Sequence, residues 1–158
     1  MELSDVRSTI IDPALNLLPE RMTSDRAIVL LLAIGLQESR FTSRIQIGGG
    51  PGRGFFQFER GGGVAGVLRH PVSRDAALRV CEARGVAPVP AQVYWRLESD
   101  DVLAAAFARL LLFTDPAPLP KIGECAKSWD YYLRTWRPGK PHRHTWDAFH
   151  QQAVEATA

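Results

Sequence analysis

The sequence has little that would place the chain in a specialised class of protein. Its only two cysteines, Cys81 and Cys125, are too few for a disulfide framework and match no zinc-site spacing. We expect both thiols to be reduced, although one disulfide would suit a protein that works outside the cell. The longest apolar run, residues 27–36, is too short to cross a bilayer. The first residues lack the basic start and apolar stretch of a signal peptide, so we expect synthesis in the cytoplasm without an export signal.

A strong charge of one sign is also missing. The net charge of +2 is too small to argue for nucleic acid, and no helical segment has the basic, polar face of a recognition helix. Residues 61–66 match the dinucleotide-binding Gly-x-Gly-x-x-Gly string, but no βαβ pattern surrounds them. His142 and His144 have no third metal ligand close in sequence. We therefore expect no nucleic acid, no cofactor and no metal.

The composition that is present is that of an ordinary globular protein. Of its 158 residues, 46% are hydrophobic and 23% are charged, which suffices for one domain with a real core over residues 1–158. There is no internal repeat and no low-complexity linker. We expect a monomer without a membrane span.

Helical patterns dominate the chain, so the predicted fold class is mainly α, with a small β contribution (α+β). Thr23-Ser24-Asp25 is a helix start signal, and the helix that follows is apolar on nearly all sides from 26 to 37 and should lie in the core. Residues 45–47 and 55–58 are β-prone and flank a glycine-rich stretch, which predicts one small β-hairpin. Further helices are expected at 4–18 (interrupted or restarted at Pro13), 64–69, 74–84 after a Ser73 cap, 90–97, 100–113 after a Ser99 cap, 122–136 and 145–156.

Glu38 is the first candidate for chemistry. It ends the apolar helix, where desolvation and exposed helix carbonyls both disfavour a carboxylate and raise its pKa. A raised pKa is what a general acid for glycoside hydrolysis needs near neutral pH. The alternative is an ordinary solvated glutamate at a helix end.

Two short segments carry a resemblance to a known family. Residues 37–41 read Gln-Glu-Ser-Arg-Phe and resemble the Glu-Ser-x-Phe signature of lytic transglycosylases and goose-type lysozymes, in the lysozyme-like superfamily. Residues 54–58, Gly-Phe-Phe-Gln-Phe, stand where that family has a Gly-Leu-Met-Gln-like segment. Residues 52–58 are also similar to the Gly-Arg-Gly segment of plant-type chitinases. The resemblance covers roughly residues 27–66 and implies a lysozyme-like helical domain with Glu38 as catalytic acid.

The resemblance also implies roles for residues near Glu38. Gln57 would lie in the cleft floor and bond the substrate or Glu38, and Ser39 would orient Glu38 or bond a sugar. Arg53, in the glycine-rich loop, is a further candidate for sugar binding, with a plain surface role as the alternative. The family's later Ala-Tyr-Asn-Ala-Gly-like segment has no match here, and the nearest aromatic pairs begin at Tyr94 and Tyr131, which we take as candidates for substrate binding.

Glu59 decides between two mechanisms. Goose-type lysozymes resemble this chain in carrying an acid two residues after the glutamine, where it could activate water for hydrolysis. The alternative is that Glu59 is a surface acid at the end of the hairpin. Without such a base, Glu38 would act as acid and then as base, with help from the sugar's N-acetyl group. The product would then be a 1,6-anhydro sugar, as in lytic transglycosylases.

We therefore expect a glycosidase that cleaves the β-1,4 bond between N-acetylmuramic acid and N-acetylglucosamine in peptidoglycan glycan strands. Delivery to the wall would come from phage lysis or virion machinery. The basic stretch 134–144 would form a rim that attracts acidic peptide stems, or a solvated loop whose tryptophans enter the core. The alternatives are a non-catalytic lysozyme-like phage virion or glycan-binding protein, and a chitinase-like glycosidase.

Overall fold

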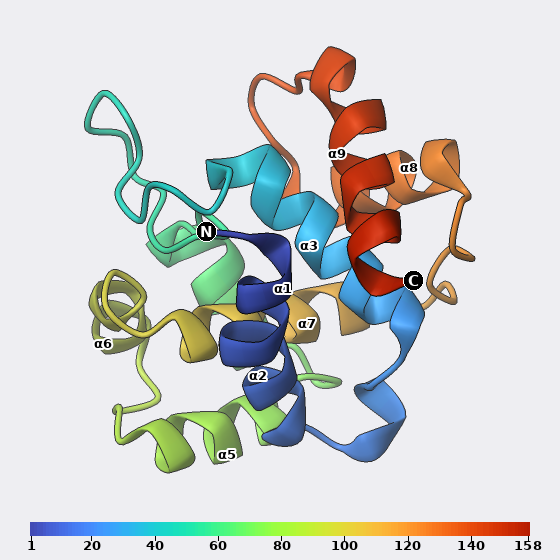
Figure 1. Cartoon of the computed structure of the whole chain (residues 1–158). Helices are drawn as coiled ribbons and strands as arrows, with labels where there is room; N and C mark the ends of the chain where they lie inside the picture. Colours follow the sequence, from blue (N-terminus) through green and yellow to red (C-terminus); the bar gives the residue numbers. More distant parts are fainter.

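The computed structural model describes all residues, 1–158, and is mainly helical (Figure 1). α7 packs against the N-terminal helices and against α3, α4 and α5, while α3 lies along α9. The elements are α1 (Leu3–Val6), η1 (Arg7–Ile11), α2 (Asp12–Asn16), η2 (Glu20–Met22), α3 (Asp25–Ser39), η3 (Arg60–Val64), α4 (Ala65–Arg69), α5 (Arg74–Arg84), α6 (Pro90–Arg96), α7 (Asp101–Phe113), α8 (Cys125–Trp136) and α9 (Arg143–Thr157).

The predicted start, end and burial of helix α3 are all confirmed. The Ser24 side chain accepts a hydrogen bond from the backbone N–H of Ala27, which satisfies one free donor of the first turn. All residues from Ala27 to Leu36 are buried. Arg40, with φ 57°, turns the chain out of the helix. Glu38 therefore stands one residue before the end of a rigid core helix.

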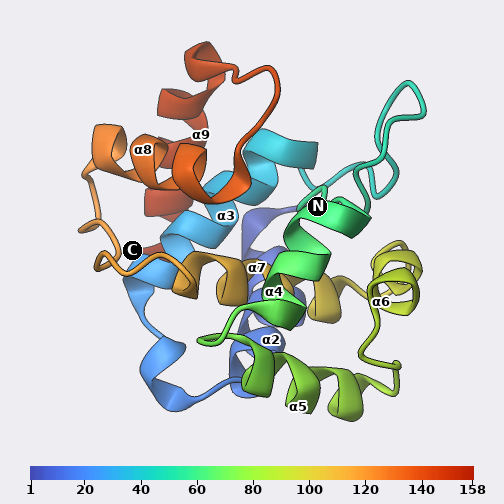
Figure 2. The same ribbon diagram turned by 180° about the vertical axis from the view of Figure 1, so that it is seen from behind.

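The predicted β-hairpin does not form. Only isolated antiparallel bridges join Arg53 to Ile45 and to Phe58, and the segment projects from the helices as an irregular loop (Figures 1 and 2). A tight turn closes between Gly54 (φ 74°) and Gln57 (φ 53°), because the Gln57 N–H donates to the Gly54 carbonyl. These left-handed conformations break the extended backbone that a strand requires.

The phenylalanines next to this turn explain why it is preferred. Phe55, Phe56 and Phe58 are all buried. A strand would place Phe55 and Phe56 on opposite faces. The turn instead brings both rings into edge contact with Phe41, just after α3.

Three local features of the helices, one at a proline and two at N-terminal caps, differ from prediction. The N-terminal helix runs through Pro13 without a restart, because a wide π-type turn, η1, precedes the proline and accommodates its missing N–H. Ser73 precedes α5, but its hydroxyl donates to the Val67 carbonyl and does not cap the helix. Asp100, and not Ser99, caps α7 by accepting from the Leu103 N–H. The Asp100 carboxylate also pairs with Arg84, a bond that a serine hydroxyl could not replace.

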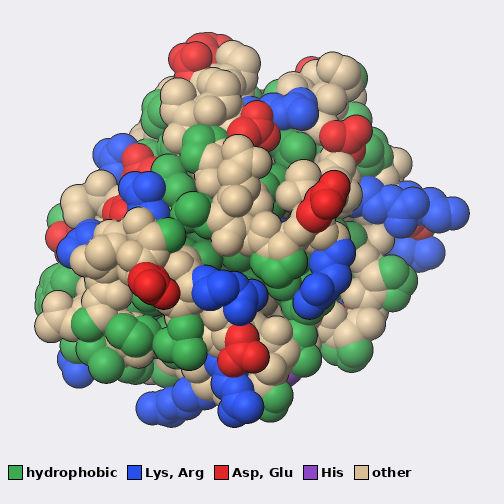
Figure 3. Space-filling model, turned by 90° about the horizontal axis from the view of Figure 1, so that it is seen from below, with side chains coloured by type: hydrophobic (Ala, Val, Ile, Leu, Met, Phe, Trp, Pro, Cys, Tyr) green, Lys and Arg blue, Asp and Glu red, His purple; other side chains and the backbone are tan.

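The buried apolar side chains of the helices form one continuous core. Cys81 and Cys125 are both free thiols. None of the helices combines the length and the apolar character that a membrane crossing needs. On the face seen in Figure 3, basic and acidic side chains are scattered among apolar and polar ones.

Candidate active site

Glu38 opens into a cleft of about 560 Å³ between the projecting loop and the C-terminal helices. The loop contributes one wall, from Gln46 to Glu59, and the segment from Tyr132 to His142 contributes the other. α3 delivers Glu38 at the junction, because its left-handed end at Arg40 turns the chain toward the loop. The lining is Gln37, Glu38, Gln46, Pro51, Gly52, Gln57, Glu59, Tyr132, Trp136, Arg137, Pro138, Gly139, Lys140 and His142.

Tyr132 on α8 is the direct partner of Glu38. Its hydroxyl donates a hydrogen bond to Glu38 Oε2. The ring of Tyr132 stacks on Trp146 at 5.3 Å and also contacts Trp129 and Trp136. Burial raises the pKa of Tyr132 far above its ordinary value, so the hydroxyl stays a donor at any physiological pH. The aromatic cluster thus fixes the position of the carboxyl group.

The pKa of Glu38 is raised to about 7. Burial is the largest cause, since the carboxylate loses water on the apolar side of the cleft. The hydrogen bond from Tyr132 lowers the pKa, because it stabilises the charged form, and the negative charge of Glu59 raises it. Around neutral pH, Glu38 is therefore a mixture of acid and carboxylate, as a general acid requires.

Ser39 joins the end of α3 to the projecting loop. Its hydroxyl lies 2.7 Å from the Phe55 carbonyl and 3.2 Å from the Gly35 carbonyl, and it accepts from the Phe41 N–H. These contacts use the donor of the hydroxyl and one of its two acceptor sites on the backbone. Ser39 thus holds the loop at a fixed position beside Glu38.

Gln57 and Glu59 both line the cleft with Glu38. The Gln57 side-chain N–H₂ donates to the Gly54 carbonyl, which leaves its Oε1 facing Gly52. Glu59 is exposed and influences Glu38 through its charge. Of the residues predicted from the sequence, these two are brought into the same cleft as the proposed acid.

Arg53 and Tyr94 lie behind the cleft wall. The Arg53 guanidinium pairs with Glu98 at 2.8 Å and donates to the carbonyls of Gly50 and Gly52. The Tyr94 hydroxyl donates to the Pro51 carbonyl. Neither residue lines the cleft, and both hold the loop against α6.

Tyr131 faces away from Glu38. Its hydroxyl donates to the carbonyls of Leu112 and Ala117, on the other side of α8 from the Tyr132 contact. One residue along a helix turns the side chain by about 100°. The spacing of Trp129, Tyr132 and Trp136 marks one helical face and is the signal that could have selected Tyr132.

Sequence reasoning did not assign a role to two further glutamines. Gln37 donates to the His142 carbonyl and accepts from Thr145, so it ties α3 to the start of α9. Gln46 Oε1 accepts a hydrogen bond from the Gly52 N–H, whereas its Nε2 has no hydrogen-bond partner within the protein. The basic rim expected from residues 134–144 is represented by Arg137, Lys140 and His142. Trp129 and Trp146 of the same region are buried in the core.

No group of three or more His, Cys, Asp or Glu side chains is placed to hold a metal ion. Comparison of the chain with protein-family models, with curated proteins and with solved structures gives no match. A functional assignment therefore rests on the chemistry of the cleft.

Proposed function

We propose that the chain is a glycosidase that cleaves the β-1,4 bond between N-acetylmuramic acid and N-acetylglucosamine in peptidoglycan. The observation that carries this proposal is the Glu38 carboxyl group, half-buried against Tyr132 and open to a cleft rich in amide and basic side chains. We further propose that phage lysis or virion machinery brings the protein to the wall.

In the first step Glu38 gives its proton to the glycosidic oxygen, and the bond from that oxygen to the sugar C1 breaks. The Tyr132 hydroxyl stabilises the carboxylate that this transfer leaves on Glu38. Positive charge develops at C1 while the leaving sugar departs as an alcohol.

Either of two second steps can complete the reaction. In hydrolysis, water attacks C1 and gives its proton to Glu59, and a reducing end results. In the transglycosylase reaction, the sugar's own C6 hydroxyl attacks C1 after assistance from the N-acetyl group and returns its proton to Glu38. The Glu59 position in the cleft favours hydrolysis as the first reaction to test.

The amide groups of Gln46 and Gln57 support an N-acetylated sugar as substrate. Both side chains meet at Gly52, and each uses one of its polar atoms on the loop backbone. The atoms left over are one donor, Gln46 Nε2, and one acceptor, Gln57 Oε1. One donor and one acceptor complement the carbonyl and N–H of an N-acetyl group.

The cations of the cleft favour peptidoglycan over chitin. These cations are Arg137 and Lys140, which line the wall opposite the loop. Lactyl and peptide carboxylates occur in peptidoglycan, while chitin has no acidic group for these side chains to attract. A chitinase-like activity remains the second candidate, on the strength of the amide pair alone.

The test is incubation of the protein with purified peptidoglycan, followed by mass spectrometry of the soluble products. Glu38→Gln should release none, and Glu82→Gln, a change of an exposed α5 glutamate outside the cleft, should behave as wild type. Retention on insoluble glycan without product from the wild type would favour the binding protein. Products from chitin alone would favour the chitinase-like reading.

A further inference from the structure

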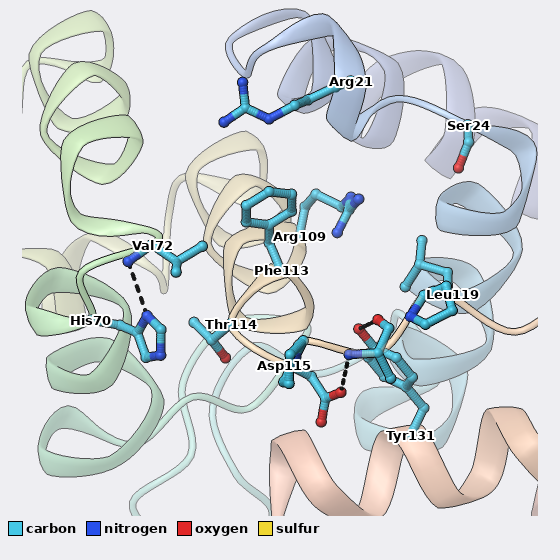
Figure 4. A pocket seen from close by; sticks show the side chains of 13 residues that line it. Arg21, Ser24, His70, Val72, Arg109, Phe113, Thr114, Asp115, Leu119 and Tyr131 are labelled. Carbon is cyan, nitrogen blue, oxygen red and sulfur yellow. Dashed lines mark hydrogen bonds between the residues drawn. The ribbon is translucent and has the colours of Figure 1, made fainter.

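A second pocket, of about 700 Å³, lies on the Tyr131 side of α8 (Figure 4). It is enclosed by η2, the ends of α4 and α7, and the proline-rich segment after α7. Neither Glu38 nor any residue that contacts it lines this space. Its polar chemistry is set by two arginines, Arg21 and Arg109, and one histidine, His70.

Arg109 is a buried cation without an anionic partner. Its side chain comes from the middle of α7 and the residue is only 5% exposed. Its Nε donates to the Met22 carbonyl at 2.7 Å, and none of the ion pairs of the protein includes Arg109. Burial lowers the pKa of Arg109, yet a guanidinium remains protonated in a protein. The two terminal nitrogens therefore carry donors that the protein itself does not use.

Arg21 provides a second guanidinium without an acidic partner, and it lies beside the same phenylalanine ring, Phe113, as Arg109. The guanidinium carbons of Arg21 and Arg109 lie 5.6 Å and 5.7 Å from the centroid of Phe113. Figure 4 shows both side chains extending into the space around this ring. Neither guanidinium forms an ion pair within the protein, so the positive charge of both stays uncompensated, and an anion in the pocket would reduce that cost.

The only acidic residue of the lining is already occupied. Asp115 accepts from the Ala117 N–H through Oδ1 and pairs with Arg134 through Oδ2. Its ion pair is with Arg134, and none joins it to Arg21 or Arg109. The pocket keeps an excess of positive charge.

We infer that this pocket binds the carboxylate of a ligand that carries a small apolar group. The two guanidiniums supply the donors for the carboxylate. His70 Nδ1 accepts from the Val72 N–H, so a neutral His70 has its proton on Nε2 and adds a donor. Val72, Phe113 and Leu119 provide apolar wall for a methyl-sized group. This apolar wall favours a carboxylate with a small apolar group over inorganic phosphate, which has no apolar part to bury.

A groove links the pocket to the Glu38 cleft. It shares Gln57, Glu59 and Trp136 with the cleft, and it shares His70, Thr114 and Asp115 with the pocket. If the proposed function is right, the carboxylate belongs to the end of a peptide stem on the same glycan that Glu38 cleaves. This assignment of the ligand rests on the proposed function, whereas carboxylate binding does not.

The experiment is an NMR titration of the intact ¹⁵N-labelled protein with N-acetyl-D-alanyl-D-alanine and with its C-terminal amide. The acid should shift the backbone amides of Val72, Thr114 and Ala117 and bind roughly tenfold more tightly than the amide, because the amide lacks the charge. Equal binding of acid and amide, or tighter binding of inorganic phosphate, would overturn the inference.

Variants locate the binding. Arg21→Gln should weaken binding of the peptide acid by about tenfold. Arg21 is exposed, so this substitution leaves the core intact. Arg79→Gln, an exposed arginine of α5 outside the pocket, should leave binding unchanged, and equal effects of both variants would contradict the pocket. Arg109→Gln serves as a second test after its melting temperature is compared, because it also loses the Met22 contact.

The peptide contains no sugar, so this titration and the peptidoglycan digest fail independently. Peptide binding without release of soluble products would keep the pocket and remove the glycosidase. Products without peptide binding would do the reverse.

Discussion

The hydroxyl of Tyr132 donates directly to the carboxyl group of Glu38, although 94 positions of the chain separate the two residues. This contact sets the proton affinity of the proposed acid from one side, while burial and Glu59 set it from the other. Each of these influences can be removed alone.

Tyr132→Phe should move the alkaline limb of the pH profile of kcat/KM upward. The lost hydrogen bond stabilises the Glu38 carboxylate, so its removal raises the pKa of Glu38 above about 7. Tyr131→Phe loses only bonds to the carbonyls of Leu112 and Ala117 and should leave the limb in place. Identical profiles for both variants would remove Tyr132 from the site.

The wild-type kcat/KM should fall about tenfold per pH unit above pH 7, because the acid form of Glu38 disappears there. A profile that stays flat up to pH 9 would contradict Glu38 as the acid.

The free energy of unfolding should also depend on the ionisation of Glu38. Glu38 in the folded chain binds its proton up to about pH 7, and in the unfolded chain only up to about pH 4.5, so folded wild type loses stability as pH rises between these values. Glu38→Gln cannot ionise. It should match wild type near pH 4 and exceed it by roughly 3 kcal/mol in free energy of unfolding near pH 8. Urea unfolding at the two pH values measures this, and an equal difference at both would reject the shift.

Glu59→Gln separates the two mechanisms. Loss of its charge should lower the pKa of Glu38 and shift the alkaline limb of kcat/KM downward. If Glu59 also activates water, the same variant should lose about a hundredfold or more in kcat. A mild loss, with products lighter by one water, would instead indicate the transglycosylase route.

Gly35→Ala should disable the site from inside α3. A Cβ at Gly35 would stand 2.0 Å from the tip of the Phe41 ring, which packs against the helix. The displaced ring would disturb the phenylalanine contacts that anchor the loop, so both the melting temperature and kcat should drop. Gly66→Ala, in α4 with open space around it, should be neutral or stabilise by up to about 1 kcal/mol. Comparable losses in both variants would indicate a general effect of helix glycines.

The elements that were predicted correctly are those specified by short stretches of neighbouring residues. The Ser24 cap and the unbroken apolar run place α3 and put Glu38 at its end, because a buried helix needs no distant information to be recognised. The prediction of a β-hairpin was wrong because burial of Phe55 and Phe56 outweighs their strand propensity. That preference depends on Phe41, a tertiary neighbour.

The partner of Glu38 needed tertiary information as well. Tyr131 and Tyr132 are chemically alike. The spacing of the aromatic residues marks the face that Tyr132 occupies, but the docking of α8 decides that this face meets α3. Arg53 was selected for a flexible loop, whereas its ion pair with Glu98 makes it a support of that loop. Side chains chosen by residue type are thus sorted into binding and supporting roles by the packing around them.

The aromatic surroundings of Tyr132 have an optical consequence. Three of the four tryptophans, Trp129, Trp136 and Trp146, contact its ring, and only Trp95 lies elsewhere, largely exposed. Three of the four indole chromophores are therefore separated from Glu38 only by the Tyr132 side chain. Emission from the unlabelled protein should follow the ionisation of that carboxyl group and the arrival of ligands, with the distant Trp95 as a nearly constant background.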